Sequence, residues 1–263
     1  MSAHKTPLTQ NEDPPEVSCR IAFISDIHGN LDALEAVLED LEEQNISSVL
    51  CLGDIVGYGP EPGACVRRIR EHCDYTVLGN HELMMLMLHS GMAADLGPEL
   101  TPALRRALHQ LTAKDREWIS ALPLGVNLEE FAIVHSSFFE PPIYHYIMET
   151  EDAEACIRDQ PAPVSFHGHT HVPMIWEKNG KAVYGVEPGN LPTKLNPNAR
   201  YCINVGSVGQ PRDGDSRAAY CIFDPLEKTV THRRVIYDIA WAQTRFEGTG
   251  LRNFDRQRIA LGD

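Results

Sequence analysis

Short runs of apolar residues recur along the chain, and a polar side chain that can bind a metal closely follows each of them. The runs are residues 21–24, 49–52, 75–78 and 131–134, and the side chains are Asp26, Asp54, Asn80 and His135. Continuous apolar runs of this length are typical of strands covered on both faces. Ligands gather at the carboxyl ends of strands in open α/β sheets, so we expect these side chains to meet at one edge of a sheet.

An amphipathic helical pattern follows the first run. Apolar residues recur at helical spacing at Leu31, Leu34, Val37, Leu38 and Leu41. This spacing predicts a helix that returns the chain to the next strand in a βαβ unit. Short polar residues favour the capping position of a helix, and both Asp26 and Asn30 precede this one. Asn30 is the better candidate, which leaves Asp26 free for a metal.

The rest of the chain divides into a helical stretch and a strand-rich stretch. Residues 84–123 lack a strand pattern and predict helices broken near residues 112–113, to which we assign no chemistry. Strands are predicted after His171, at residues 172–176, 182–185, 201–205, 219–223 and 230–237, with turns at 179–180 and 224–225. We expect these strands to form a second sheet that closes the first. Residues 239–261 predict a helix interrupted at 248–250.

Length and composition favour one large domain. The chain has 263 residues, and no shift in composition marks a second domain within residues 19–263. Residues 1–18 combine prolines and acidic groups without periodicity, which predicts a disordered tail. The expected organisation is therefore a short tail followed by a single α/β domain that ends in a helical segment.

Charge and hydropathy narrow the possible partners and the location. The formal net charge is −14, from 37 acidic and 23 basic residues, which argues against general binding to nucleic acids. No stretch reaches the roughly 18–20 apolar residues of a membrane span, and the first residues do not resemble a signal peptide. The seven scattered cysteines are typical of reduced thiols. We expect a cytoplasmic protein that does not bind membranes.

Five short clusters carry side chains that suit metal chemistry. They are residues 26–28, 53–54, 79–82, His135 and residues 168–171. Their carboxylate, imidazole and amide groups suit manganese, iron and zinc alike, and the absence of cysteine from these clusters disfavours thiolate-rich zinc or iron–sulfur sites. Two divalent ions about 3.5–4 Å apart can clamp a phosphoryl group and activate water. The clusters therefore predict a two-metal centre that cleaves a phosphate ester.

Some of these residues also have ordinary structural explanations. A lone histidine such as His135 is more often structural than a ligand, although its place directly after an apolar run favours a ligand. Alternation along a strand would put His167, His169 and His171 on one face. Asn80 also suits a turn.

The order of the clusters resembles the signature of the calcineurin-like metallophosphoesterase superfamily. That signature runs Asp-x-His, Gly-Asp, Gly-Asn-His-Asp/Glu, a lone His and Gly-His-x-His, and all five parts occur between Asp26 and His171. Residues 52–60 and 204–212 resemble a small prokaryotic branch of the superfamily. The resemblance implies a four-layer α/β/β/α sandwich, in which two mixed sheets are flanked by helices.

The resemblance also implies which residues hold the metals. They are Asp26, His28 and His171 for one ion, Asn80, His135 and His169 for the other, and Asp54 as the bridge between both. The nucleophile would be a metal-activated hydroxide. His81 would contact the phosphate or protonate the leaving oxygen. His167 would belong to the core or support the ligands, and Asn80 and His81 would contact the substrate. Apart from the resemblance, Arg212 is a further candidate for a substrate contact.

The chain departs from the wider family at three positions. Protein Ser/Thr phosphatases and symmetrical dinucleoside polyphosphate hydrolases of the superfamily have an Asp-Arg pair where this chain has Gly57 and Tyr58. The acidic partner of His81 and a phosphate-binding arginine are therefore missing from their usual places. Ser136 stands where glycine is common. Arg212 either supplies the missing positive charge or is a surface residue beside a turn at 213–215.

The expected activity is hydrolysis of small phosphodiesters or phosphomonoesters at a centre of two divalent ions. Alternatives are a non-catalytic scaffold of the same fold, a nucleotide sensor with slow turnover, a protein Ser/Thr phosphatase and a dinucleoside polyphosphate hydrolase. A scaffold would be expected to have lost ligands, and all seven are present with His81. The natural substrate, the metal and the oligomeric state are not determined by these features.

Overall fold

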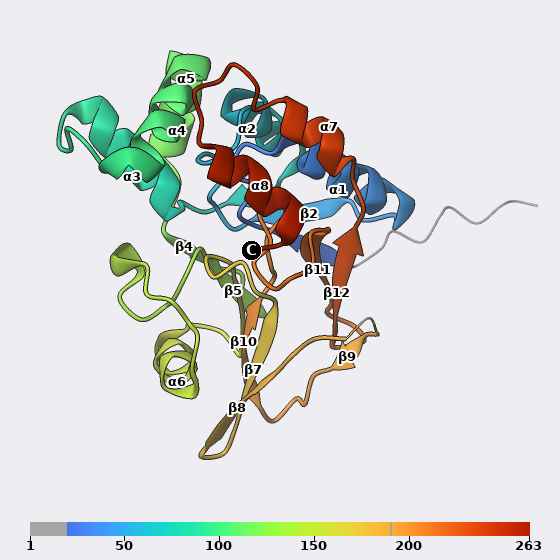
Figure 1. Cartoon of the computed structure of the whole chain (residues 1–263). Helices are drawn as coiled ribbons and strands as arrows, with labels where there is room; N and C mark the ends of the chain where they lie inside the picture. Colours follow the sequence, from blue (N-terminus) through green and yellow to red (C-terminus); the bar gives the residue numbers. More distant parts are fainter. Residues whose placement is uncertain (1–19, 190) are drawn as a thin grey trace, which may run out of the picture.

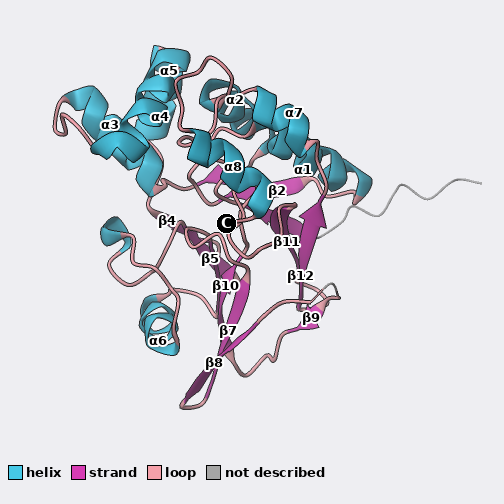
Figure 2. Cartoon of the chain, viewed as in Figure 1, coloured by secondary structure: helices cyan, strands magenta, loops and turns pink. Residues whose placement is uncertain are grey.

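Two sheets of six strands pack against each other and carry helices on their outer faces (Figures 1 and 2). The computed structural model describes residues 20–189 and 191–263, so the predicted tail at residues 1–18 lies outside the described residues. The two mixed sheets between layers of helices confirm the predicted α/β/β/α sandwich.

The first sheet combines a parallel half with an antiparallel half. In spatial order its strands are β3 (Tyr75–Thr76), β2 (Ser48–Cys51), β1 (Ile21–Ile24), β11 (Ala218–Asp224), β12 (Thr229–Val235) and β9 (Thr193–Lys194). Strands β1, β2 and β3 are parallel neighbours, whereas β11 runs antiparallel to β1. The carboxyl ends of β1, β2 and β3 therefore share one edge.

The second sheet has the same mixed character. In spatial order its strands are β4 (Gly125–Asn127), β5 (Phe131–Val134), β6 (Val164–His167), β10 (Arg200–Asn204), β7 (Met174–Asn179) and β8 (Ala182–Val186). Strands β5, β6 and β10 are parallel, so the segments that follow them also leave from one edge.

Among the described residues, seven α-helices share a core with the first sheet, and one packs on the second. The seven are α1 (Leu31–Glu43), α2 (Pro62–His72), α3 (Asn80–Ser90), α4 (Gly97–Gln110), α5 (Ala113–Ser120), α7 (Ile239–Thr244) and α8 (Asn253–Leu261). Helix α6 (Thr150–Asp159) packs against Trp176 and Cys202 of the second sheet and lies apart from the others in Figure 1. None of the described helices is long and apolar enough to cross a membrane.

The helix boundaries follow the predicted signals. The Asn30 side chain accepts a hydrogen bond of 3.2 Å from the Ala33 amide, which confirms Asn30 as the cap of α1. The predicted break near residues 112–113 is confirmed, because Thr112 caps α5 through the Asp115 amide. The expected interruption at 248–250 separates α7 from α8.

The predicted division of strands between the sheets was wrong in part. Strands β7, β8 and β10 belong to the second sheet as expected, but β11 and β12 extend the first. Strand β5, which we expected in the same sheet as β1, lies in the second sheet. The reason is that β1 pairs with β11, about two hundred residues away in sequence, and periodicity reports no such distant partner.

Aromatic rings fill the space between the two sheets. Phe23 of β1 stacks on Phe166 of β6 with ring centroids 3.8 Å apart and an interplanar angle of 12°. Phe131 of β5 meets Phe23 edge to face at 5.4 Å. All three rings are buried. This aromatic core fixes the separation of the two sheets and so the relative position of the segments that leave their edges.

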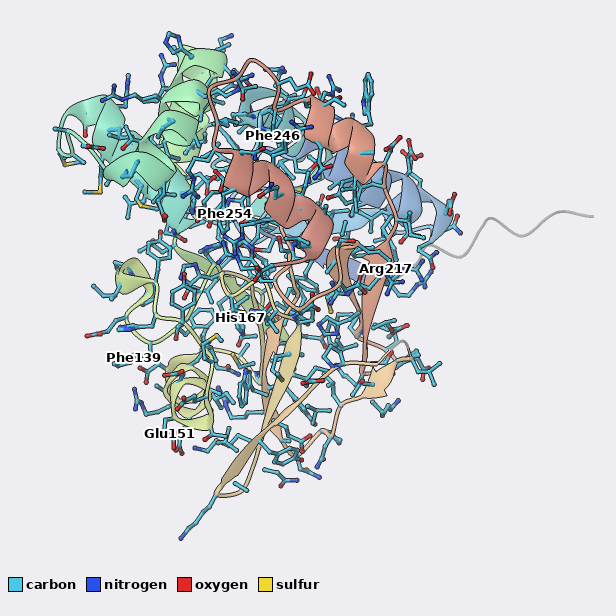
Figure 3. The ribbon with its side chains drawn as sticks, viewed as in Figure 1. Phe139, Glu151, His167, Arg217, Phe246 and Phe254 are labelled. Atoms are coloured by element: carbon cyan, nitrogen blue, oxygen red, sulfur yellow. The ribbon has the colours of Figure 1, made fainter. Side chains whose placement is uncertain are left out.

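Replacing Phe23 with alanine should lower the free energy of unfolding by about 3–5 kcal/mol, because it empties a ring-sized space between the sheets. Phe254 of α8 is 53% exposed (Figure 3), and Phe254→Ala should cost under about 1 kcal/mol. Urea unfolding followed by circular dichroism measures both. Equal losses in the two variants would contradict the assigned core.

Candidate metal centre

The segments after β1, β2, β5 and β6 converge where the edges of the two sheets face each other. The Asp26 amide donates to the Gly53 carbonyl over 3.1 Å, and the Gly168 amide donates to the His135 carbonyl over 2.9 Å. The His169 amide joins the two sheets by donating to Asp26 Oδ2 over 3.0 Å. The predicted clusters do come together, but at the edges of two sheets rather than of one.

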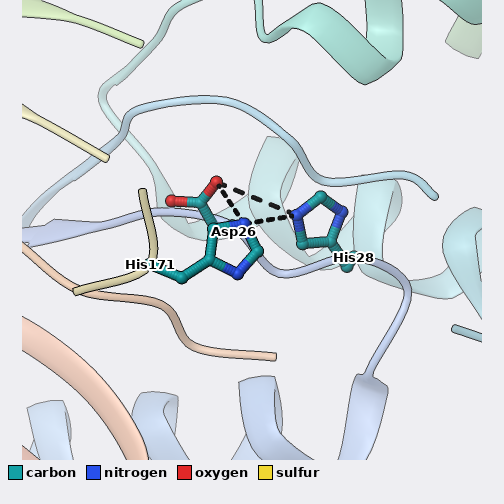
Figure 4. Close-up of side chains that lie close together, drawn as sticks. All are labelled: Asp26, His28 and His171. Atoms are coloured by element: carbon teal, nitrogen blue, oxygen red, sulfur yellow. Dashed lines mark hydrogen bonds and ion pairs between the residues drawn. The ribbon is translucent and has the colours of Figure 1, made fainter. Parts of the chain in front are cut away.

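The first group contains Asp26, His28 and His171 (Figure 4). His28 Nε2 lies 3.1 Å from His171 Nε2. Asp26 Oδ1 lies 3.8 Å from His28 Nε2 and 3.3 Å from His171 Nε2. Asp26 Oδ1 is buried and has no hydrogen-bond partner among the described residues. One acceptor oxygen and two imidazole nitrogens thus face a common point, as a cation site requires.

The second group contains Asp54, His135 and His169. His135 Nε2 lies 3.3 Å from Asp54 Oδ2 and 3.0 Å from Asn80 Oδ1. The rings of His135 and His169 are 5.1 Å apart between centroids. The group therefore offers carboxylate, amide and imidazole ligands together.

Asp54 connects the two groups. Its Oδ2 lies 3.7 Å from His28 Nε2 on one side and 3.3 Å from His135 Nε2 on the other. Its Oδ1 accepts a hydrogen bond of 2.9 Å from the His81 amide, which fixes the carboxylate plane. One oxygen of Asp54 is therefore placed between both candidate sites, where a bridging ligand would stand.

Backbone carbonyls orient three of the imidazoles. The Nδ1 atoms of His28, His135 and His171 lie 3.1, 2.7 and 2.6 Å from the carbonyls of Val56, Leu52 and Gln210. A carbonyl can only accept, so each Nδ1 carries a hydrogen, and each Nε2 is the nitrogen left to bind a metal once it is deprotonated. Imidazole nitrogens that face one another and a carboxylate in this way fit a divalent cation between them.

Burial and charge set the ionisation of the centre. Burial raises the pKa of Asp54, but His135 and His81 outweigh it and hold that pKa well below its usual range. Burial, together with His135, lowers the pKa of His169 to about 3. Burial lowers the pKa of His135 as well, but the Asp54 carboxylate raises it to about 9. Ligands bind in their deprotonated form, so metal uptake should release the His135 proton.

Several of the predicted ligands also have a strained backbone conformation. Five of the seven predicted ligands have a left-handed backbone, with φ of 54° at Asp26, 49° at His28, 52° at Asp54, 69° at His169 and 62° at His171. Such residues cost about 1–3 kcal/mol each and persist where the surrounding structure holds them. The clustering of strain at the converging ligands is typical of a functional site.

The motif glycines are required by close packing around the ligands. A Cβ at Gly79 would lie 2.2 Å from Asp54 Oδ1 and 2.6 Å from Glu82 Oε2. A Cβ at Gly168 would lie 2.3 Å from Asp26 Oδ2. Gly79 and Gly168 therefore leave room for a carboxylate of another motif.

The segment at residues 204–212 supports the first group. Asn204 Nδ2 donates to the Gly168 carbonyl over 2.6 Å, which braces the loop before His169. Ser207 Oγ and the Gly209 amide both donate to the Asp26 carbonyl, over 2.8 and 3.0 Å. The segment thus holds the backbone of the loops that carry the predicted ligands.

Comparison with known proteins agrees with this geometry. The family model described as the calcineurin-like phosphoesterase superfamily domain matches residues 19–228. The chain belongs to the calcineurin-like phosphoesterase superfamily. It is thus a phosphoric ester hydrolase of a metal-dependent family, as the motif order predicted.

Similar proteins come from bacteria and archaea. A metallophosphoesterase from Sphaerobacter thermophilus has a solved structure with a TM-score of 0.83 and 35% identity, covering 94% of this chain and 100% of that one. An uncharacterized protein of Methanocaldococcus jannaschii is 33% identical, over 94% of this chain and 99% of its own. A symmetrical bis(5'-nucleosyl)-tetraphosphatase of Psychromonas ingrahamii is 34% identical, but over only 43% of this chain and 41% of that enzyme.

Glu82 is a buried residue of the phosphoesterase motif whose function the sequence analysis did not assign. Its Oε2 accepts from the amides of Asp54 and Gly79, over 2.8 and 3.1 Å, and its Oε1 accepts from the Val56 amide over 2.9 Å. Burial and the nearby Asp54 raise the pKa of Glu82 to about 7. Glu82 therefore ties the two middle motifs together and positions Asp54. The signal available in the sequence for this supporting role was an acidic residue three positions after Gly79.

The His81 imidazole lies beside the Asp54 carboxylate but makes no hydrogen bond to it. Its Nε2 lies 3.9 Å from Asp54 Oδ2, and its buried Nδ1 has no hydrogen-bond partner within the described part of the chain. A Cβ at Gly57 would lie 2.2 Å from that Nδ1, so Gly57 makes room for the ring. The ring of Tyr58 packs 4.8 Å away. Packing against Gly57 and Tyr58 therefore orients the His81 ring.

Arg212 lies at the cavity that opens onto the centre. The cavity has a volume of about 140 Å³ and is lined by Asp54, Tyr58, Asn80, His81, Met84, Leu100, Tyr146, His169, His171 and Arg212. The Arg212 guanidinium lies 5.9 Å from the centroid of the Tyr58 ring, and its Nη2 donates to Gln210 Oε1 over 3.0 Å. Arg212 therefore forms part of the cavity wall and is not simply a surface residue beside the turn at 213–215.

His167 and Ser136 lie outside the set of potential ligands. Strand β6 ends at His167, and His169 and His171 belong to the loop after it, so the alternative explanation that all three share one face of a strand does not hold. His167 is buried and its Nδ1 lies 3.2 Å from the Gly168 carbonyl (Figure 3). Ser136 turns its hydroxyl away to the His145 carbonyl.

Gly79→Ala should weaken Mn²⁺ binding by at least about tenfold, because the new methyl group displaces Asp54 or Glu82 and disturbs the support of the ligands. Gly189→Ala is the matched control, since a Cβ there meets no atom within 4 Å. Isothermal titration of metal-stripped protein measures both. Unchanged Mn²⁺ affinity in Gly79→Ala would contradict the packing described.

Proposed function

We propose that this phosphoesterase hydrolyses small phosphodiesters or phosphomonoesters at a centre of two divalent ions. The observation that carries the proposal is the position of Asp54 Oδ2 between His28 and His135. One ion would be held by Asp26, His28 and His171. The other would be held by Asn80, His135 and His169, with Asp54 bridging the two ions.

The ligand chemistry supports a site for two metal ions but does not determine which metal binds. When bound, a pair of divalent ions supplies an activated water as nucleophile and neutralises charge on the phosphoryl group. Carboxylate, amide and imidazole ligands suit manganese, iron and zinc. The identity of the metal therefore stays a prediction. The cytoplasmic location also stays a prediction.

Three side chains of the cavity would contact the substrate. Asn80 lies between the second candidate metal site and the cavity and would position the phosphoryl group. His81 would donate a hydrogen bond from Nε2 to a phosphate oxygen. Burial lowers the pKa of His81, which favours a neutral imidazole that donates a hydrogen bond over one that protonates the leaving oxygen. Arg212 would add positive charge where Gly57 and Tyr58 replace the Asp-Arg pair.

The cavity can hold the reacting group of a small substrate. Its volume of about 140 Å³ is enough for a phosphoryl group, and the rest of the substrate would extend through the open mouth. Hydrolysis of a dinucleoside polyphosphate is the second candidate, because several partial relatives are symmetrical bis(5'-nucleosyl)-tetraphosphatases. The missing Asp-Arg pair disfavours this activity and protein Ser/Thr phosphatase activity alike. The complete set of buried donors disfavours a non-catalytic scaffold or a slow nucleotide sensor.

Metal-stripped protein supplied with Mn²⁺ should hydrolyse bis(p-nitrophenyl) phosphate, and a chelator should abolish the turnover. Asp54→Asn should lower kcat at least about 10³-fold, because the shared ligand of both ions loses its charge. Release of p-nitrophenol measures the rate. Asp224→Asn, at the last residue of β11 and outside the cavity, is a matched control. Chelator-resistant turnover, or full activity in Asp54→Asn, would contradict the proposal.

His81→Ala should lower kcat by about 10²–10³-fold while leaving Mn²⁺ affinity unchanged, as expected for loss of one donor to the transition state. The loss should be similar for p-nitrophenyl and alkyl leaving groups if His81 contacts the phosphate. A loss confined to the poorer alkyl leaving group would instead assign protonation of the leaving oxygen to His81.

A further inference from the structure

The cavity at the centre has one wall that the phosphoryl chemistry does not use. Met84, Leu100 and Tyr146 line it together with the predicted ligands and substrate contacts. None of these three side chains belongs to the predicted ligand set, and Met84 and Leu100 offer no hydrogen-bond donor to a phosphate. They are suited to an apolar or aromatic part of the substrate.

Tyr146 is placed directly against the second candidate metal site. Its ring stacks on the His169 imidazole with centroids 4.3 Å apart and an interplanar angle of 21°. The residue is nevertheless 52% exposed. Since one face of the ring is covered by His169, the exposed part is the opposite face and the edges. A flat aromatic surface thus stands beside the position of the phosphoryl group.

The segment that carries Tyr146 is anchored on both sides of the centre. The Tyr144 hydroxyl donates to the Leu78 carbonyl over 3.3 Å, and the Tyr144 ring meets His135 edge to face at 5.8 Å. The Ser136 hydroxyl donates to the His145 carbonyl. These contacts fix the backbone next to Tyr146, so its ring is already in place before a ligand arrives, which lowers the entropic cost of binding.

Other exposed tyrosines lack this combination. Tyr75 and Tyr184 are 46% and 41% exposed, but they lie on the edge strands β3 and β8 and do not line the cavity. Exposed single aromatic residues are ordinary on protein surfaces. Tyr146 differs because it is exposed, stacks on a predicted ligand and lines the cavity.

We propose that Tyr146 is a stacking platform for an aromatic ring of the substrate, so that the enzyme selects phosphoesters of nucleosides over those of aliphatic alcohols. The inference rests on the proposed function, because it places the phosphate at the two-metal centre. The base would stack on the free face of Tyr146 and meet the side chains of Met84 and Leu100. Every base has a flat π-face, so this contact selects for a base without selecting among bases.

The test compares AMP with ribose 5-phosphate, which share sugar and phosphate and differ in the base. Calorimetry on Mn²⁺-loaded protein gives the ratio of the two dissociation constants. ³¹P NMR shows whether either probe is cleaved. If one is cleaved, the ratio of the KM values is used instead of the ratio of the dissociation constants. AMP should bind wild-type protein at least about fivefold more tightly, since stacking on one aromatic side chain contributes between about 5-fold and 150-fold.

Variants separate stacking from a structural role. In Tyr146→Ala the preference for AMP should fall to near one, whereas Tyr146→Phe should keep it. Ile143→Ala, on the same segment and 63% exposed, should leave it unchanged. A Tyr146 that merely supports His169 would weaken both probes equally in Tyr146→Ala and leave the ratio intact.

Each outcome bears on one hypothesis. No preference for AMP in the wild type, or a preference that survives Tyr146→Ala, would overturn the platform. Failure of the proposed function would look different, since neither probe would then need Mn²⁺ to bind and bis(p-nitrophenyl) phosphate would not be cleaved.

Discussion

The Asp54 carboxylate is the group around which the centre is built. Burying a charge without partners is costly, so a buried carboxylate must be surrounded by donors or cations. Here the His81 amide holds one oxygen, and the imidazoles of His28 and His135 lie on two sides of the other. The two imidazoles come from different sheets, and Asp54 is the side chain through which both candidate metal sites are linked.

Holding Asp54 in this position constrains the neighbouring motifs. Glu82 binds the backbone on both sides of it, and Gly79 leaves the space that its carboxylate occupies. The left-handed backbone at Asp54, at Asp26 and at three predicted histidine ligands is a further cost. The stacked Phe23 and Phe166 beneath the site keep the two sheets at the separation that this arrangement needs. The free energy gained by packing the core thus offsets the cost of the strained backbone at the site.

The sequence was informative where the determinants are local. Apolar runs located β1, β2 and β5, helical spacing located α1, and the motif order brought out the residues that the structure gathers around Asp54. Pairing of β1 with β11 was not predictable, because partner choice between distant strands leaves no periodic trace. Tyr146 was missed for a similar reason: its place beside His169 depends on a loop anchored by contacts from other segments.

The most direct measurement of the central claim is a crystal structure of the Mn²⁺-loaded protein with anomalous scattering data. We expect two anomalous peaks about 3.5–4 Å apart, one beside Asp26, His28 and His171 and one beside Asn80, His135 and His169, with an Asp54 oxygen between them. A single peak, or two peaks that do not share Asp54, would contradict it.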